Sequence, residues 1–305
     1  MEESWGRRIL HLITPLIVYQ GMTILIEIAA AVLWAARHQT DFLVDTDKLD
    51  QGKMMQAMSD FTVNYSLLIQ GIAALISIFI LLHMYRRDFS SRRFVFDSRS
   101  VAGPLWLLLI PTGIASSLCG NFYLNIGSLA QNSESFAQAE KMLFSGPFVI
   151  QLICIGFIIP VCEEFVFRGI IYMRMRQYSG VNMSIVFSAL IFGLMHGNLI
   201  QGIYAFLLGV LLAYTFEKYG SLAAPVIIHI CANLTALAIS MAGEKNFPSE
   251  TSALLTGGTI AFVIALILVF IIDRNVDAER IYLDDPDPAG SRTNDGNQEN
   301  ERGRY

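Results

Sequence analysis

The chain has 305 residues, of which 54% are hydrophobic and only 15% are charged, and its formal net charge is −5. Soluble domains carry about a quarter of charged residues, so this composition excludes an ordinary soluble globular protein and indicates a polytopic membrane protein. The 23 Gly show no period, which excludes a collagen-like chain, and 4 Cys are too few for a disulfide-rich one. The high apolar content excludes a disordered chain. The sequence contains no basic stripe with interleaved aromatic residues, so nothing in it indicates nucleic-acid binding.

Eight apolar runs are long enough, or nearly so, to cross a bilayer, which takes about 20 residues per helix. They predict an all-α fold, a polytopic membrane helix bundle of about eight transmembrane helices. In chain order the runs lie near residues 9–36, 64–84, 101–124, 146–172, 183–199, 201–217, 221–243 and 253–273. The fifth and sixth runs form one continuous apolar stretch, in which Gly197-Asn198 predicts the break.

Polar segments between and after these runs divide the chain. Residues 37–63 and 125–145 are predicted to be polar loops on the outer side. Residues 1–100 form an N-terminal two-span region, and residues 101–275 form the core together with the last span. Residues 276–305 contain few apolar side chains, so we expect them to form a disordered cytoplasmic tail.

The distribution of Lys and Arg predicts the orientation, because basic loops stay on the cytoplasmic side of a membrane. With the N-terminus inside and eight spans, most of the 21 Lys and Arg residues fall in cytoplasmic segments. We therefore expect an integral, multi-pass membrane protein that is surrounded by membrane lipid and has both termini in the cytoplasm.

The fourth span carries three charged residues. A charged side chain at the bilayer centre costs at least about 2.5 kcal/mol, so such residues are candidates for function. Arg168 follows Glu164 by four residues, which places the two on one helix face as an ion pair. Glu163 points about 100° away around the helix and has no partner in its own span, so its carboxylate is suited to take a proton from water. The alternative is a purely structural ion pair with a second Glu near the inner surface.

Two later spans carry polar residues at helical spacing. Phe192 precedes His196 by four residues, so an aromatic ring and an imidazole share one face, although a buried structural His gives the same pattern. His229 precedes Asn233 by four residues, so both side chains can donate hydrogen bonds to one point. The alternative for this second pair is a polar clamp between helices.

Taken together, these residues indicate one shared site. Glu163, Glu164, His196, His229 and Asn233 come from three spans, and burying them is less costly around a single water-containing cavity. Such a cavity is equipped for hydrolysis, in which Glu163 takes a proton from water and His196 helps to hold that water. His229 and Asn233 would donate to the oxyanion that develops on a cleaved carbonyl group.

Three motifs in this order, on successive spans, resemble those of the CPBP family: Glu163-Glu164-x-x-x-Arg168, Phe192-x-x-x-His196 and His229-x-x-x-Asn233. The family comprises CAAX prenyl proteases of the Rce1 type and bacterial Abi proteins that process bacteriocins or give immunity to them. The resemblance covers roughly residues 100–243. It implies an eight-helix membrane protease fold, a bacterial plasma membrane, the roles given above, and supporting roles for Glu164 and Arg168.

The same residues leave a metal alternative open. Glu163, His196 and His229 would form a His₂Glu ligand set, which suits catalytic zinc. However, the sequence lacks a His-Glu-x-x-His motif. With Glu163 on a metal, the base would have to be Glu164, and pairing with Arg168 is expected to make Glu164 a poorer base. We therefore expect a glutamate mechanism without a metal cofactor, with zinc as the alternative.

The leading hypothesis is an intramembrane endopeptidase, a hydrolase of the CAAX protease type, that acts on a peptide or membrane-protein substrate. A prenylated CAAX-like C-terminus, a leader peptide or a membrane-protein segment would each fit. The alternative is a non-catalytic membrane regulator or bacteriocin-immunity protein that binds a membrane partner. A proton-coupled transporter is disfavoured, because the sequence shows no inverted repeat.

Overall fold

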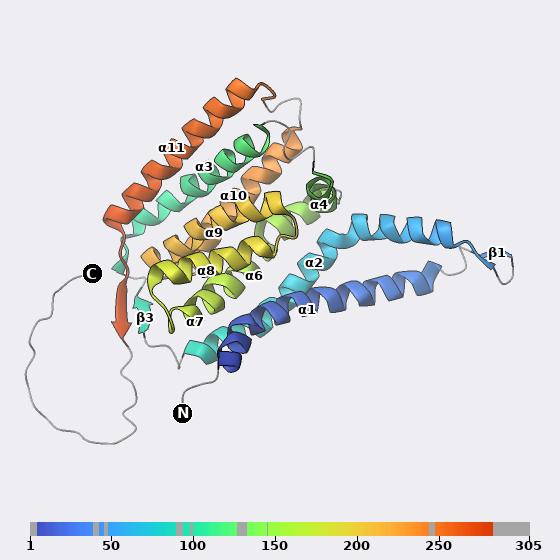
Figure 1. The fold of residues 1–305 in the computed structure, drawn as a ribbon, viewed down its shortest axis with the longest axis horizontal. Coiled ribbons are helices and arrows are strands. Elements are labelled where there is room, and N and C mark those ends of the chain that lie inside the picture. Colours follow the sequence, from blue (N-terminus) through green and yellow to red (C-terminus); the bar gives the residue numbers. More distant parts are fainter. Residues whose placement is uncertain are drawn as a thin grey trace, which may run out of the picture.

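A computed structural model of the chain describes residues 5–38, 43–45, 48–89, 94–97, 100–126, 133–144, 146–243 and 248–282. This part of the chain is a bundle of helices with two short strand pairs (Figure 1). The predicted all-α membrane bundle is therefore confirmed.

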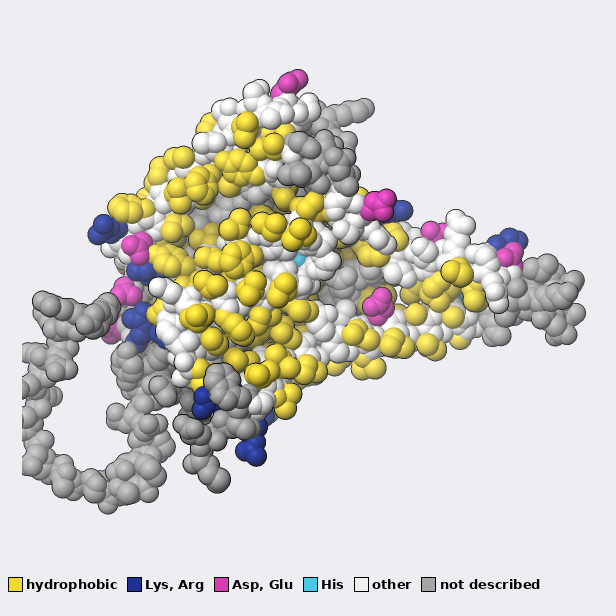
Figure 2. Space-filling view, viewed as in Figure 1, with side chains coloured by type: hydrophobic (Ala, Val, Ile, Leu, Met, Phe, Trp, Pro, Cys, Tyr) yellow, Lys and Arg dark blue, Asp and Glu magenta, His cyan; other side chains and the backbone are white. Residues whose placement is uncertain are grey.

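Seven helical segments of the described chain are long and apolar enough to cross a membrane. They are α1 (Trp5–His38), α2 (Gln51–Phe89), η3 with α3 (Gly103–Leu108 and Leu109–Leu124), the run from α5 to α7 (Phe148–Met175), α9 (Leu199–Tyr219), α10 (Ala223–Ala242) and α11 (Thr251–Asn275). Hydrophobic side chains are spread widely over the face of the bundle seen in Figure 2, as a lipid-facing surface requires. Lys and Arg gather mainly at the end where the chain termini lie.

The predicted fifth span is a shorter helix. Helix α8 (Val181–Leu194) has 14 residues, or about 21 Å of length, which is less than the roughly 30 Å of a bilayer core. The predicted break at Gly197-Asn198 is confirmed, because Gly197 adopts a left-handed φ of 75°. Asn198 then caps α9, since its side chain accepts a hydrogen bond from the backbone N–H of Gln201.

Both predicted outer loops contain helix, so these two boundaries were wrong. Helix α2 begins at Gln51, well before residue 64, because residues 53–63 contain no Gly or Pro that would end a helix. Helix α4 (Glu134–Phe144) lies in the second predicted loop. Glu134 in its first turn and Lys141 in its last turn both interact favourably with the helix dipole. The α1–α2 hairpin extends beyond the other helices and ends near β1 (Leu43–Asp45) and β2 (Lys48–Leu49) (Figure 1).

The beginning of the predicted disordered tail is ordered. Strand β4 (Glu279–Tyr282) pairs antiparallel with β3 (Phe94–Asp97). Val276 and Ala278 are buried, and the backbone N–H of Ala278 donates to the carbonyl of Lys218. These few apolar residues give the segment a surface to bury. The polar composition of residues 276–305 as a whole hid this short apolar segment. Residues 283–305 lie outside the described residues.

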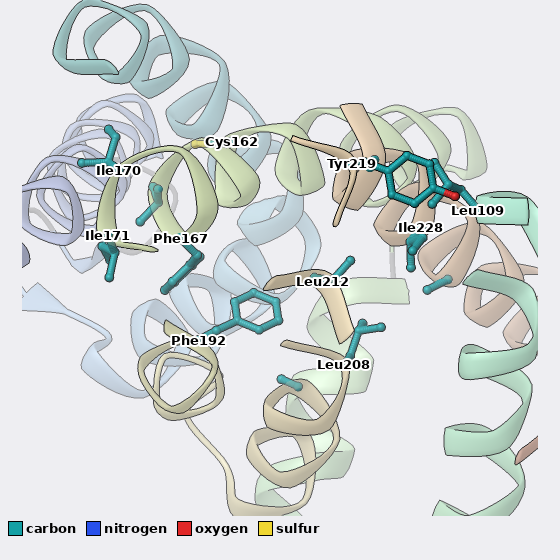
Figure 3. Close-up of a cluster of buried hydrophobic side chains, with 14 of the residues drawn as sticks. Leu109, Cys162, Phe167, Ile170, Ile171, Phe192, Leu208, Leu212, Tyr219 and Ile228 are labelled. Carbon is teal, nitrogen blue, oxygen red and sulfur yellow. The ribbon is translucent and has the colours of Figure 1, made fainter. Parts of the chain in front are cut away.

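The core surrounds the helix that carries the acidic pair. Cys162 and Phe167 on that helix pack with Phe192 of α8, Leu212 of α9 and Ile228 of α10 (Figure 3). The contact between α8 and α9 depends on Gly209, where an added Cβ would come within 3.1 Å of both Ala189 and Phe192. This close packing holds the three polar motifs in one region of the bundle.

Candidate active site

The acidic pair lies between two π-helical turns of one membrane-spanning helix. Helix α5 (Phe148–Ile153) continues through η5 (Cys154–Ile158), α6 (Ile159–Glu164), η6 (Phe165–Tyr172) and α7 (Met173–Met175), and η5 and η6 are π-helical. Pro160 has no backbone N–H, so the carbonyls of the preceding turn lose a helical partner. Wider turns of this kind are frequent at functional sites.

Glu164 is fully buried and is held by two cationic or polar side chains. Its Oε1 accepts a hydrogen bond from Arg168 Nη1 at 2.9 Å, as the four-residue spacing led us to expect. The same oxygen lies 2.8 Å from Nδ1 of His229. Arg168 Nη2 donates to the carbonyl of Gly209 at 3.0 Å, so the guanidinium also ties the site helix to α9. A buried carboxylate with these partners is strongly fixed in position.

The imidazole of His229 lies between the two glutamates. Because the carboxylate of Glu164 only accepts hydrogen bonds, His229 donates to it from Nδ1. The other ring nitrogen, Nε2, lies 3.6 Å from Oε2 of Glu163. Glu163 thus has no partner in its own span, as the sequence indicated, but it meets His229 of another span.

Glu163 is the residue around which the charges converge. It interacts electrostatically with His229, His196, Glu164 and Arg168. Its side chain keeps 16% of its surface exposed, whereas the Glu164 side chain has none. Of the two glutamates, Glu163 is therefore the one that water can reach.

Phe192 organises the rings of the site. Its ring contacts His196 with centroids 4.8 Å apart and His229 with centroids 5.7 Å apart, both edge to face. The guanidinium of Arg168 lies 4.8 Å from the same ring. The sequence suggested only the contact with His196, because the other two partners come from different spans.

His196 follows the end of α8. Its Nδ1 lies 2.8 Å from the backbone carbonyl of Phe192. A carbonyl only accepts, so Nδ1 carries the hydrogen and Nε2 of the neutral ring is an acceptor. That nitrogen is suited to accept a hydrogen bond from water.

Asn233 lies one turn after His229 on α10 and makes a contact that the sequence left open. Its Nδ2 donates to the backbone carbonyl of Ile155 at 3.0 Å, within the π-helical turn η5. This bond is a polar clamp between helices, and it uses one of the two N–H groups of the amide. The second N–H and the amide oxygen point in other directions and can bind other groups.

Two residues of this region were missed by sequence reasoning. Tyr19 of α1 is buried and interacts electrostatically with Glu163. Gly209 of α9 accepts a hydrogen bond from Arg168 through its backbone carbonyl. A lone Tyr in an apolar span and a backbone carbonyl carry no sequence signal.

Among the described residues, no group of three or more His, Cys, Asp or Glu side chains is arranged to hold a metal ion. The nitrogen of His229 that would bind a metal in the His₂Glu set, Nε2, faces Glu163, while Nδ1 is engaged by Glu164.

Residues 145–235 match the family model described as type II CAAX prenyl endopeptidase Rce1-like. This segment contains all three motifs and agrees with the family resemblance of the sequence. The comparisons with curated proteins and with solved structures gave no match. The family similarity supports an intramembrane protease of the CAAX type in general terms.

Proposed function

We propose that the chain is an intramembrane endopeptidase in which Glu163 activates a water molecule. The position of Glu163 carries this proposal: it is the accessible carboxylate of a buried polar cluster, with His229 3.6 Å away and His196 within electrostatic reach. The match of residues 145–235 to a protease family gives independent support.

The first step is the activation of water. Glu163 takes one proton from a water molecule, and Nε2 of His196 accepts a hydrogen bond from the other water hydrogen. The water oxygen attacks the carbonyl carbon of the scissile peptide bond, and the carbonyl electron pair moves to its oxygen. The products of this step are a tetrahedral intermediate and a protonated Glu163.

His229 stabilises the negative oxygen of that intermediate. Its Nδ1–H is directed at Glu164, so Nε2 also carries a hydrogen when the ring is an imidazolium. Nε2–H and the second N–H of Asn233 then donate to the oxyanion. Arg168 keeps Glu164 in place and balances its charge.

The last step breaks the C–N bond. The electron pair of the oxyanion re-forms the carbonyl, the amine leaves, and its nitrogen takes the proton that Glu163 holds. One peptide ends in a new carboxylic acid, which keeps the second water hydrogen until it ionises, and the other in a new amine, so one water molecule is consumed and Glu163 is regenerated. No step in this sequence uses a metal ion.

The substrate we propose is a peptide bond in a membrane-associated chain. The family similarity favours a prenylated, CAAX-like C-terminus, while a leader peptide or a membrane-protein segment would present the same bond. At one end of the bundle, Arg174 binds Asp88 of α2 and the carbonyl of His11 in α1, and β4 pairs with β3, which follows α2. Next to β4, Ala278 donates to the carbonyl of Lys218 in α9. We place this end on the cytoplasmic side, because most Lys and Arg lie in the connecting segments there.

A comparison in cells tests the proposal. Membranes of cells with the wild-type protein and with Glu163→Gln are compared for peptide fragments by mass spectrometry. Fragments that depend on the wild-type protein should disappear with Glu163→Gln, which keeps the size of the side chain and removes the base. Glu27→Gln, a change in a surface-exposed glutamate of α1, is the matched control and should leave the fragments unchanged. Equal fragments from wild type and Glu163→Gln, with an unchanged phenotype, would favour a non-catalytic regulator.

A further inference from the structure

Gly209 of α9 lies where three helices of the site meet. Its backbone carbonyl accepts a hydrogen bond at 3.0 Å from Nη2 of Arg168, on the helix that carries Glu163. Toward α8 there is no room for a side chain, because an added Cβ would lie 3.1 Å from Cδ1 of Phe192 and 3.1 Å from Cα of Ala189. A helical carbonyl accepts from the N–H four residues later and keeps a second lone pair, so α9 binds a guanidinium without any polar side chain.

The guanidinium of Arg168 depends on few partners for its orientation. It is fully buried, and its Nη1 donates to Oε1 of Glu164 at 2.9 Å while Nη2 donates to Gly209. Its Nε has no hydrogen-bond partner among the described residues. The ring of Phe192 lies 4.8 Å from the guanidinium, and the same ring packs against Gly209. The carbonyl and the ring therefore fix Arg168 from two sides.

A continuous series of contacts links Gly209 to the proposed base. Oε1 of Glu164, which Arg168 holds, lies 2.8 Å from Nδ1 of His229. Nε2 of His229 lies 3.6 Å from Oε2 of Glu163. The other oxygen of Glu164 has no hydrogen-bond partner within the described part of the chain, so Oε1 alone fixes this side chain by hydrogen bonds there. A movement of α9 therefore reaches the site through the guanidinium.

We propose that Gly209 is a positioning residue for the proposed reaction. Its carbonyl and its lack of a side chain set the place of Arg168, and Arg168 in turn sets the places of Glu164 and His229. The inference rests on the proposed function, in which His229 donates to the oxyanion. A Cβ at 3.1 Å is closer than the roughly 3.5–4.0 Å of ordinary carbon contacts, so any side chain at Gly209 has to move α9 away from α8 or displace the ring of Phe192.

Steady-state kinetics of the full-length protein in lipid nanodiscs test the proposal, with a fluorogenic prenylated peptide as the probe. We expect Gly209→Ala to lower kcat about tenfold and to change KM less than about twofold, because a misplacement of about 1 Å costs about 100-fold in rate and the shift here is smaller. The matched control is Gly258→Ala, where an added Cβ would lie 3.2 Å from Tyr123 at the contact of α11 with α3. This control should lower the melting temperature by a similar amount and keep the wild-type kcat.

Arg168→Lys tests whether Gly209 acts through the guanidinium. Lys keeps the charge but lacks the planar fork that binds Glu164 and Gly209 together, so kcat should fall. In this background, Gly209→Ala should lower kcat less than about twofold further, whereas two losses that multiply would contradict the proposal. If Gly209→Ala does not fold, Arg168→Lys alone decides. A lower kcat with unchanged KM then supports the proposal, and a wild-type kcat overturns it.

Glu163→Gln, measured in parallel, separates the two proposals. An inactive Glu163→Gln together with a wild-type kcat for Gly209→Ala would overturn the role of Gly209 and leave the proposed function standing. An equal loss of kcat in Gly258→Ala would also overturn that role, because the effect would then come from helix packing in general. An active Glu163→Gln would overturn the proposed function itself.

Discussion

Nδ1 of His229 lies 2.8 Å from Oε1 of Glu164, and both side chains are almost completely buried. This contact fixes which ring nitrogen of His229 carries a hydrogen and leaves Nε2 facing Glu163. In the proposed mechanism, Glu164 therefore acts through His229, as a positioning residue that orients the imidazole. The two adjacent glutamates of the motif have different tasks in that mechanism.

The charge of Glu164 can be tested by an isosteric change. Glu164→Gln keeps an oxygen that accepts from Arg168 and His229, and places an amide at Oε2, which has no hydrogen-bond partner among the described residues. We expect kcat to fall about 100-fold, because a neutral amide holds the ring of His229 less firmly than a carboxylate does. Kinetics and thermal unfolding of the same preparation measure the effect. Wild-type kcat in a folded Glu164→Gln protein would contradict the positioning role.

Phe192 should be needed for both stability and activity. Phe192→Ala removes a ring that is 1% exposed and contacts both imidazoles and Arg168. We expect a loss of about 3–5 kcal/mol in the free energy of unfolding, from lost burial and the cavity that remains. Phe192→Leu, which refills part of the space, should recover more stability than activity. Equal recovery of both would indicate that the ring only fills space.

The dependence on metal ions distinguishes the two mechanisms considered for these residues. We expect the purified protein to keep its activity after dialysis against a strong chelator, because in the proposed mechanism Glu163 acts as the base and His229 as a hydrogen-bond donor, not as metal ligands. Peptidase assays before and after chelation check this. Loss of activity that returns on addition of zinc would replace the proposed mechanism with one based on the His₂Glu set.

Glu217 should stabilise the bundle without taking part in chemistry. Its carboxylate, 5% exposed, binds Arg176 at 3.3 Å and Arg280 at 3.0 Å, which ties β4 to the end of α9. We expect Glu217→Gln to lower the free energy of unfolding by about 1–3 kcal/mol, since the two arginines keep at most a neutral acceptor and lose their counter-charge. Glu250→Gln, at an exposed position, is the control. A melting temperature equal to that of wild type would show that β4 is held by its backbone alone.

The sequence predicted the bundle and the chemical type of the site more completely than it predicted the contacts. Apolar runs identify spans because lipid demands them, and the spacing of Glu164 and Arg168 predicted their pairing. The helical ends in residues 37–63 and 125–145 were missed, because polar helices outside the membrane lack an apolar run. Asn233 binds the carbonyl of Ile155, which lies in the π-helical segment η5. The sequence did not predict this contact, because a π-helical segment arises from packing around Pro160 and has no pattern of its own.

The most direct test of the account is peptide hydrolysis in water enriched in oxygen-18. The purified wild-type protein and Glu163→Gln are incubated with a prenylated CAAX-like peptide, and the cleaved product is analysed by mass spectrometry. We predict that the wild-type product carries one solvent oxygen atom in its new terminal carboxylate and that Glu163→Gln forms no product. Labelled product from Glu163→Gln at the wild-type rate would contradict the role of Glu163 as the base that activates water.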